Sequence, residues 1–311
     1  MKIFNKLNLI EICIKLTAFI VISALILIFI FIAKESLPIF TSREIHNETN
    51  LSKLFLPQEY NPNKGKEFLW QPVSKIPKYS VIVLLLGTLK VTFVALIFAV
   101  PIAIMAAIFT SEFSSNFIKE FIKPIIEILA GLPSVVLGFF ALMILATWFQ
   151  NAFGWTFRLN AITAGIAIGL AVIPIVYTIT EDALNAVPKT YRDGALALGA
   201  NKWQTAYRIV LPAASPGIFA ACILGLGRAI GETMIVLMAS GNAAIMTLDF
   251  TQSVRTLSAT IAAELAEVVV GSTHYCVLFF IGAFLFIITF FINLLGYWFV
   301  NRLRIKLEGK A

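Results

Sequence analysis

Two residues of opposite charge, Arg228 and Glu232, lie four positions apart within an apolar stretch of the sequence. In an α-helix this spacing places both side chains on one face. Charged side chains are costly in contact with lipid, so such residues usually face a bundle interior or a wet cavity. Arginine presents its donors in a planar fork that suits a tetrahedral oxyanion, and Thr233 adds a hydroxyl beside the pair. The stretch indicates either an anion pathway or a structural ion pair that locks helices.

The composition of the chain places this pair in a membrane. Of the 311 residues, 59% are hydrophobic and only 13% are charged, whereas about a quarter are charged in soluble proteins. Several apolar segments reach the length of about 20 helical residues that a bilayer core requires. The sequence therefore predicts an all-α integral membrane protein with six transmembrane helices. We place these helices at residues 14–33, 81–109, 125–149, 160–179, 214–239 and 277–300.

The distribution of positive charge predicts the orientation. Outside residues 34–80, most lysines and arginines lie in the N-terminus, the 110–124 and 180–213 loops, and the C-terminus. Because positively charged loops remain in the cytoplasm, we expect both termini there. No basic stripe stands apart from the membrane flanks, so the net charge of +7 does not indicate nucleic-acid binding. The chain then divides into a cytoplasmic N-terminus with a first transmembrane anchor (1–33), an extracytoplasmic loop (34–80), a core domain of five transmembrane helices (81–300) and a cytoplasmic tail (301–311).

The 180–213 loop is longer than a simple connection between two spans requires. We expect a short helix over residues 189–198, which Gly199 ends in the left-handed conformation. A second helix should begin at Asn201, with Gln204 completing a capping box, and should stop at Leu211-Pro212. An amphipathic linker that rests on the membrane is one interpretation. The other depends on the order and spacing of seven residues: Asp193, Gly194, Ala195, Gly199, Ile209, Leu211 and Pro212.

This order resembles the EAA loop of ABC-importer permeases, which docks on an ATPase subunit. The first two positions of that motif are usually Glu and Ala, so Asp193 and Gly194 depart from it while the spacing is kept. The resemblance implies a type I ABC importer permease architecture with a peripheral first span. No Walker A sequence occurs. We therefore expect a transport subunit that is not an enzyme and holds no cofactor, with ATP and Mg²⁺ bound by a partner ATPase subunit.

The third predicted span contains a helix-bending pair, Pro133 and Ser134. Proline removes a backbone donor and can bend the helix, and the serine hydroxyl can satisfy part of what the proline frees. Such a bend suits the gating of an alternating-access pore, although bends also occur in static bundles.

Two longer motifs make the resemblance more specific. Residues 225–234 (GLGRAIGETM) and 129–140 (LAGLPSVVLGFF) are similar to the membrane subunits of the phosphate-specific ABC importer. Residues 70–72 (WQP), 87–89 (GTL) and the long first outer loop are more similar to its PstC-type than to its PstA-type subunit. The resemblance implies that residues 81–300 form the permease, and that Arg228, Glu232 and Thr233 belong to the phosphate path.

The same resemblance implies a set of partners. These are a PstA-type permease subunit that forms a heterodimer with this chain, two copies of a nucleotide-binding ATPase beneath the pair, and an extracytoplasmic phosphate-binding protein. The setting would be the bacterial inner membrane, with membrane lipid around the chain. The 34–80 loop either lies on the outer membrane surface or contacts the substrate-delivering protein.

Other functions remain open at this point. A permease for another oxyanion, sulfate or molybdate, would share the EAA loop. A secondary phosphate transporter would show inverted repeats and discontinuous helices, neither of which is visible in the sequence, and a membrane sensor or scaffold could coexist with transport. The three cysteines are far apart, and His46 and His274 lie in separate outer loops where we expect them to face solvent. These residues predict no metal site and no catalytic set.

Overall fold

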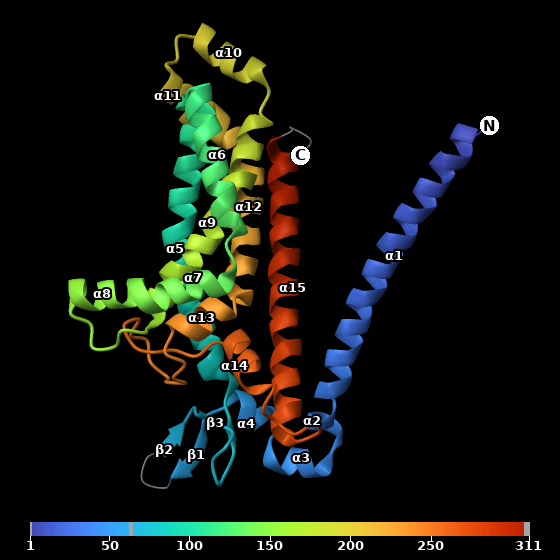
Figure 1. Ribbon diagram of the computed structural model, residues 1–311, viewed down its shortest axis with the longest axis vertical. Helices are drawn as coiled ribbons and strands as arrows, with labels where there is room; N and C mark the ends of the chain where they lie inside the picture. The colour runs from blue at the N-terminus through green and yellow to red at the C-terminus, as the bar shows by residue number, and fades with distance from the viewer. Residues whose placement is uncertain (1, 62–64, 308–311) are drawn as a thin grey trace.

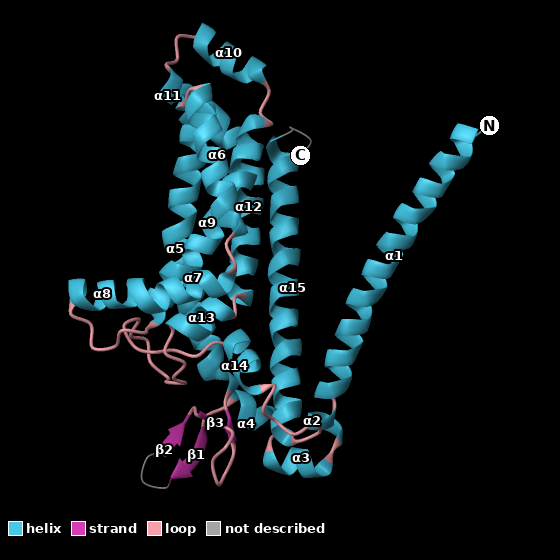
Figure 2. Cartoon of the chain, in the orientation of Figure 1, coloured by secondary structure: helices cyan, strands magenta, loops and turns pink. Residues whose placement is uncertain are grey.

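The computed structural model describes residues 2–61 and 65–307, so the last four residues of the expected cytoplasmic tail lie outside it. The regular structure is helical except for two small hairpins (Figure 2). Six helical segments in the described part are long and apolar enough to cross a membrane, which agrees with the six expected spans. They are Glu11–Thr41, Val81–Phe113, Ser134–Phe153, Ala161–Asn185, Lys202–Gly231 and Thr273–Ile305.

The centre of the bundle is α9 (Ala161–Asn185), which packs against α5 (Val81–Ile108) and α12 (Leu211–Gly231). Glycines allow the close approach of α5 and α9. A Cβ on Gly165 would lie 2.5 Å from the Cβ of Val94 in α5. On its other side α12 packs against α15 (Thr273–Leu307), and the four helices run side by side (Figure 1). Small residues replace large ones where helices must approach closely in a membrane.

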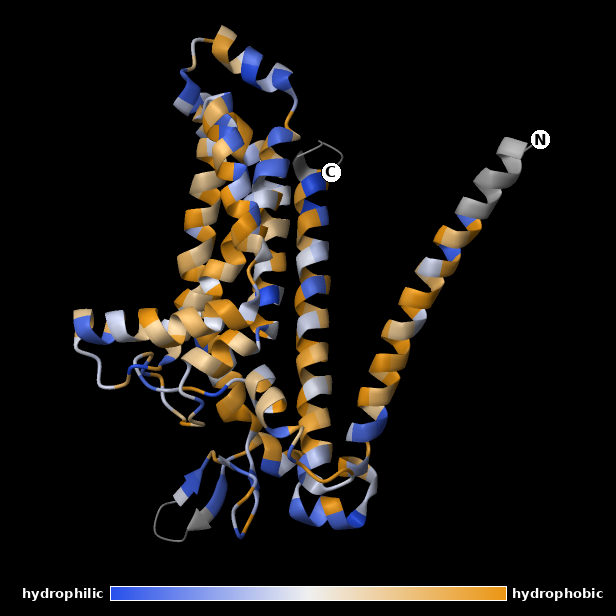
Figure 3. Cartoon of the chain, in the orientation of Figure 1, coloured by the Kyte–Doolittle hydropathy of each residue, from blue (hydrophilic) through white to orange (hydrophobic). Residues whose placement is uncertain are grey.

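The first helix, α1 (Lys2–Ser36), stands apart from this bundle (Figure 1). It contacts α15 near its C-terminal end, where Phe29 packs against Phe286 and Phe31 against Phe279. Apart from the exposed Glu11–Lys15 ion pair, most of its described surface is apolar and exposed, as the orange colour in Figure 3 shows. Such a surface suits lipid, and the position agrees with the peripheral first span that the resemblance implied.

The third span is not the single bent helix expected over residues 125–149. Helix α6 (Asn116–Gly131) ends before Pro133, and Leu132 and Pro133 have extended backbones. The chain then continues as α7 (Ser134–Phe140), a π-helical turn (Ala141–Leu145) and α8 (Ala146–Phe153), which run across the direction of the bundle (Figure 1). Proline disfavours helical backbone at the residue before it, so the prediction of a bend understated a complete break.

The fifth span also differs from the continuous helix expected over 214–239. Helix α12 ends at Gly231, and α13 (Met234–Ala239) begins only after Glu232 and Thr233. The two short helices that follow the breaks, α7 and α13, pack against each other. A Cβ on Gly138 of α7 would lie 2.9 Å from the Sδ of Met238 in α13. The two interruptions therefore occur in adjoining parts of the fold.

Residues 37–80 fold on the end of the bundle opposite α10 (Lys189–Ala197; Figure 1). Ile39, Leu54, Trp70 and Tyr79 from this segment share a buried cluster with residues of α5, α14 (Leu257–Glu264) and α15. The segment thus uses the ends of the spans to complete a core that it is too short to form alone. Its elements are α2 (Pro38–Thr41), α3 (Arg43–Glu48), α4 (Leu51–Phe55), the hairpin of β1 (Gln58–Asn61) and β2 (Gly65–Glu67), and the hairpin of β3 (Trp70–Gln71) and β4 (Lys78–Tyr79).

At the other end of the bundle, α5 closes in a π-helical turn (Phe109–Phe113), and α10 is followed by α11 (Lys202–Thr205). A second π-helical turn (Ala206–Val210) joins α11 to α12 without interruption. The first turns of α1 and the last turns of α15 lie at this same end (Figure 1).

Candidate translocation and coupling sites

Arg228 and Glu232 form an ion pair across the break in the fifth span. The Nη2 atom of Arg228 lies 3.7 Å from Oε2 of Glu232. We expected both residues on one helical face, but only Arg228 belongs to α12; Glu232 is the first residue beyond it and has an extended backbone. Its carbonyl accepts a hydrogen bond of 2.7 Å from the Ser258 hydroxyl at the start of α14. This bond holds the break in place from outside the span.

The exposure of the pair is unequal. The Glu232 side chain is 7% exposed, whereas that of Arg228 is 44% exposed. At 3.7 Å the contact is longer than a hydrogen bond, so the guanidinium keeps donors for another acceptor. An arginine this exposed within a span would be costly against lipid, so we expect this side to face protein or water. Thr233 turns its hydroxyl back to the Gly231 carbonyl, 3.2 Å away, rather than toward Arg228.

The break at Pro133 satisfies its backbone without the serine hydroxyl that we expected to help. The Pro133 carbonyl accepts from the N–H groups of Val136 (2.9 Å) and Leu137 (3.3 Å). Within the described residues, Ser134 Oγ makes no hydrogen bond. The helix therefore restarts through backbone bonds alone, and Ser134 contributes as its first residue.

The loop between α9 and α12 contains most of the local structure that the sequence indicates. Gly199 has a φ of 84°, and the capping box is complete: Asn201 Oδ1 accepts from Gln204 N–H at 2.8 Å, and Gln204 Oε1 accepts from Asn201 N–H at 2.9 Å. The expected stop at Leu211-Pro212 is wrong. Pro212 lies in the first turn of α12, where its missing N–H is tolerated, and the helix before it widens into a π turn.

Several side chains of this loop project into open space. Leu198 is 91% exposed, and Trp203 and Tyr207 are more than half exposed and stack on each other with parallel rings. Asp193 is exposed and makes no hydrogen bond within the described residues. A Cβ on Gly194 would meet nothing within 4 Å, so glycine is not required there for packing. Of the other motif residues, Ala195 is buried, Ile209 and Pro212 are exposed, and Leu211 is half-buried.

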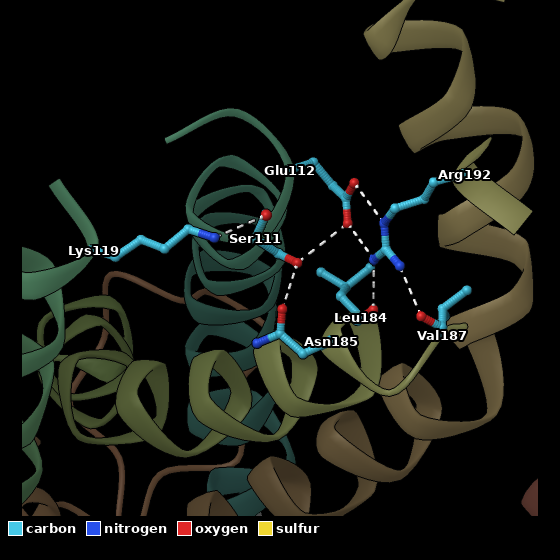
Figure 4. A network of polar contacts seen from close by, with 7 residues as sticks. All are labelled: Ser111, Glu112, Lys119, Leu184, Asn185, Val187 and Arg192. Atoms are coloured by element: carbon cyan, nitrogen blue, oxygen red, sulfur yellow. Dashed lines mark hydrogen bonds and ion pairs between the residues drawn. The ribbon is translucent and has the colours of Figure 1, made fainter. Parts of the chain in front are cut away.

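A residue that the sequence reasoning missed fastens this loop to the bundle. Arg192 donates from Nε to Oε2 of Glu112 (3.1 Å) and from Nη2 to Oε1 (2.6 Å). It also donates to the carbonyls of Leu184 (2.9 Å) and Val187 (2.7 Å) at the end of α9 (Figure 4). The available signal was an arginine directly before the Asp193 motif and an acidic residue at the end of the second span.

A second charged cluster, also missed, lies at the opposite end of the molecule. The carboxylate of Glu264 in α14 lies 2.7 Å from Nη2 of Arg255 and 2.8 Å from Nε2 of His274, and it accepts a hydrogen bond of 3.2 Å from the Trp70 indole N–H. His274 is therefore largely buried, and the expectation that it faces solvent is wrong. Burial pushes the pKa of Glu264 up, but the His274 hydrogen bond and the Arg255 charge outweigh it, so the pKa lies below its usual range. Burial, with Glu48 and Glu264 nearby, raises the pKa of Tyr79 to about 12.

The fold and these sites are those of a membrane-embedded transport subunit. The third span is interrupted at Pro133, the fifth is interrupted at the charged pair, and an exposed helical loop lies at one end of the bundle. The chain belongs to the family of inner membrane components of binding-protein-dependent transport systems, whose model matches residues 99–305. It is therefore a multi-pass inner membrane permease component of an ABC importer, not the ATPase. ATP is bound by a separate ATPase subunit in this family, and a binding protein is a further partner.

Individual relatives agree with this assignment. The chain is 31% identical to phosphate transport system permease protein PstC 1 of Mycobacterium tuberculosis, with 72% of this chain and 73% of that protein covered. It is 30% identical to the PstC protein of Pasteurella multocida (78% and 80% covered) and 30% identical to the probable ABC transporter permease protein YqgH of Bacillus subtilis (73% and 74% covered).

Solved structures agree on the fold. The chain resembles a subunit of the inward-facing MetNI methionine ABC transporter with a TM-score of 0.58 at 18% identity, covering 72% of this chain and 95% of that one. It resembles a chain of a bacterial alginate ABC transporter, in complex with a periplasmic protein, with the same TM-score of 0.58 at 14% identity (90% and 92% covered). The type I importer architecture expected from the loop is thus confirmed.

Proposed function

We propose that this chain is the PstC-type permease of an ATP-driven importer for inorganic phosphate. The observation that carries the proposal is Arg228, a half-exposed guanidinium in a membrane-spanning helix beside a buried carboxylate. The names of the PstC relatives, each about a third identical to this chain over most of its length, support phosphate as the anion.

In this function Arg228 is a transient counter-charge for phosphate. Glu232 orients the guanidinium and can accept a hydrogen bond from a protonated oxyanion such as hydrogen phosphate. Thr233 lies beside Glu232 on the same path, although its hydroxyl donates to the Gly231 carbonyl. A pore site must release its anion as readily as it binds it, so tight capture belongs to a phosphate-binding protein on the outer face. One guanidinium with a loosely held carboxylate suits such a weak site.

The breaks at Pro133-Ser134 and Glu232 are the points where the pore changes shape. The segment from Asp193 to Pro212 docks on the ATPase, two copies of which lie below this chain and a PstA-type permease. Both termini are then cytoplasmic, as is the end of the bundle that carries α10. Residues 37–80 lie on the extracytoplasmic side, where the loaded phosphate-binding protein arrives. The exposure of Leu198 and Trp203 supports docking at α10 and α11.

The test is uptake into proteoliposomes that hold this chain, its partner permease and the ATPase, with loaded binding protein outside. Phosphate uptake with ATP is compared with sulfate uptake for wild type and Arg228→Gln. Arg158→Gln, which removes a cation between the third and fourth spans, is the matched control. We expect phosphate uptake in wild type and control, and loss in an Arg228→Gln complex that still assembles.

Each other outcome contradicts a defined part of the proposal. Preference for sulfate would assign a different oxyanion, and uptake without ATP would exclude the importer mechanism. Normal transport by Arg228→Gln would leave Arg228 as a structural partner of Glu232 only.

A further inference from the structure

Helix α10 is connected to the bundle through few contacts. Its backbone packs against α11 and the following π turn, and three residues, 186–188, link it to the end of α9. Among the residues that the structure describes, Arg192 is the one residue of α10 whose side chain hydrogen-bonds to α9 or to the end of α5. The orientation of α10 relative to these helices therefore depends on this side chain.

The contacts of Arg192 use the shape of the guanidinium group. Two nitrogens of Arg192 donate to the two oxygens of Glu112, and further N–H groups donate to the carbonyls of Leu184, in the last turn of α9, and Val187, just beyond it (Figure 4). The Arg192 side chain is only 21% exposed and that of Glu112 only 10%, so water competes weakly for these bonds. A lysine carries the same charge on a single nitrogen and cannot reproduce the fork.

The same cluster joins further elements. Ser111, next to Glu112, lies 3.2 Å from the Glu112 carboxylate and 3.0 Å from the Asn185 side-chain oxygen of α9. The Lys119 ammonium of α6 donates to the Ser111 carbonyl at 3.2 Å. Figure 4 shows these groups in one network, in which Lys119 and Asn185 contact Ser111, and Ser111 and Arg192 contact the Glu112 carboxylate. Of the helices that this network joins, α5 and α9 belong to the bundle, and α6 leads to the break at Pro133.

We propose that the Arg192–Glu112 pair is the joint through which movement of α10 reaches α5, α6 and α9. This inference rests on the proposed docking of the Asp193–Pro212 segment on the ATPase. With the joint intact, a displacement of α10 is transmitted through Arg192 to the ends of α5 and α9, and through Ser111 to α6. Without it, α10 can turn about the 186–188 link while the bundle stays in place. Arg192 is thus a positioning residue whose loss separates ATP hydrolysis from pore movement.

The experiment uses the assembled complex in proteoliposomes with two readouts. The first is the number of ATP molecules hydrolysed per phosphate imported. The second needs no substrate assignment: a cysteine at Gly131, where a Cβ meets nothing within 4 Å at the end of α6, is labelled by a water-soluble maleimide with and without ATP. Cys13 and Cys222 are replaced by serine, and buried Cys276 is retained. The variants are Arg192→Lys, Glu112→Gln and the exchange Arg192→Glu with Glu112→Arg. Glu120→Gln, an exposed carboxylate on α6, is the control.

We expect both single variants to hydrolyse ATP while uptake falls at least tenfold and the ATP effect on labelling disappears. The control should behave as wild type, and partial recovery in the exchanged pair would support the joint. Unchanged ATP per phosphate and unchanged labelling in Arg192→Lys and Glu112→Gln would overturn the inference. If wild type fails to import phosphate, but its labelling responds to ATP and that response is lost in both single variants, the proposed substrate is wrong and the joint stands.

Discussion

The hydroxyl of Ser258 donates to the backbone carbonyl of Glu232 at 2.7 Å, although the two residues are 26 positions apart. This bond joins the first turn of α14 to the point where the fifth span breaks. The other end of α14 carries Glu264, which binds Arg255, His274 and Trp70. One short helix therefore connects the charged pair in the span to the charged cluster around Glu264.

Ser258→Ala should reduce transport without preventing assembly. The variant loses the hydroxyl bond to the carbonyl of Glu232, worth about 1 kcal/mol, and a longer contact of 3.4 Å with the Thr256 hydroxyl. Ser253→Ala is a matched control, because the Ser253 hydroxyl donates to the Leu159 carbonyl at 2.8 Å away from the pair. We expect similar small decreases in the melting temperatures of both, measured in detergent, and a several-fold loss of uptake only for Ser258→Ala. Equal uptake by the two variants would show that the bond does not position Glu232.

Gly87→Ala should destabilise the chain strongly. A Cβ at this position would lie 2.1 Å from the backbone oxygen of Arg255, so α5 and the segment before α14 would have to separate. Overpacking of this kind costs about 1–3 kcal/mol. Gly131→Ala, where the added methyl meets nothing, should be neutral or slightly stabilising. Thermal unfolding of the two variants measures the difference, and equal melting temperatures would contradict the close approach.

The charged cluster around Glu264 should make the stability of the chain depend on pH. Its pKa lies below the usual range of about 4.3 for glutamate, so the folded state favours the carboxylate. That stability is present above the pKa of the unfolded chain and is lost as the pH falls through the lower pKa of the folded state. Glu264→Gln should therefore be less stable than wild type at pH 7, and the difference should shrink as the pH falls below about 4. A difference in melting temperature between the two proteins that stays the same at every pH would show that Glu264 is not responsible.

Two local signals in the sequence predicted local structure correctly, whereas the stop expected at Leu211-Pro212 was wrong. Gly199 and the Asn201–Gln204 capping box depend on residues within one turn, so their outcome could be predicted without knowledge of the tertiary fold. The six apolar segments could be predicted because bilayer thickness alone sets their length. The Asp193–Pro212 spacing predicted the class of protein, which the family match confirms.

The breaks in the helices could not be predicted in the same way. Pro101 and Pro174 lie inside continuous helices, whereas Pro133 lies in the break between α6 and α7. The fifth span breaks at Glu232, which is not a proline at all. What differs is packing: α7 and α13 lie against each other, and Ser258 holds the Glu232 carbonyl. Contacts between different elements also explain why Arg192 and Glu264 were missed, since Glu112 is 80 positions from Arg192 and Trp70 is 194 from Glu264. His274 is only ten positions from Glu264 but lies on another helix.

Leu198 provides a test of the docking surface. The side chain is 91% exposed at the end of α10, so it contributes little to the stability of this chain by itself. Burying a leucine on a partner contributes about 1.5–3 kcal/mol, which corresponds to roughly a tenfold or greater change in affinity. Leu198→Ser should therefore weaken ATPase binding by about that factor without changing the melting temperature of the chain.

Val73→Ser is the matched control for Leu198→Ser, because Val73 is 93% exposed in the turn between β3 and β4, at the opposite end of the molecule. Titration of the purified ATPase onto the permease pair in nanodiscs measures both affinities. If α10 meets the ATPase, only Leu198→Ser weakens binding, since Val73 is too far from that end to contribute. Equal affinities for the two variants would place the ATPase contact outside the tip of α10. The aromatic pair Trp203 and Tyr207 on the following helix would then be the next surface to test.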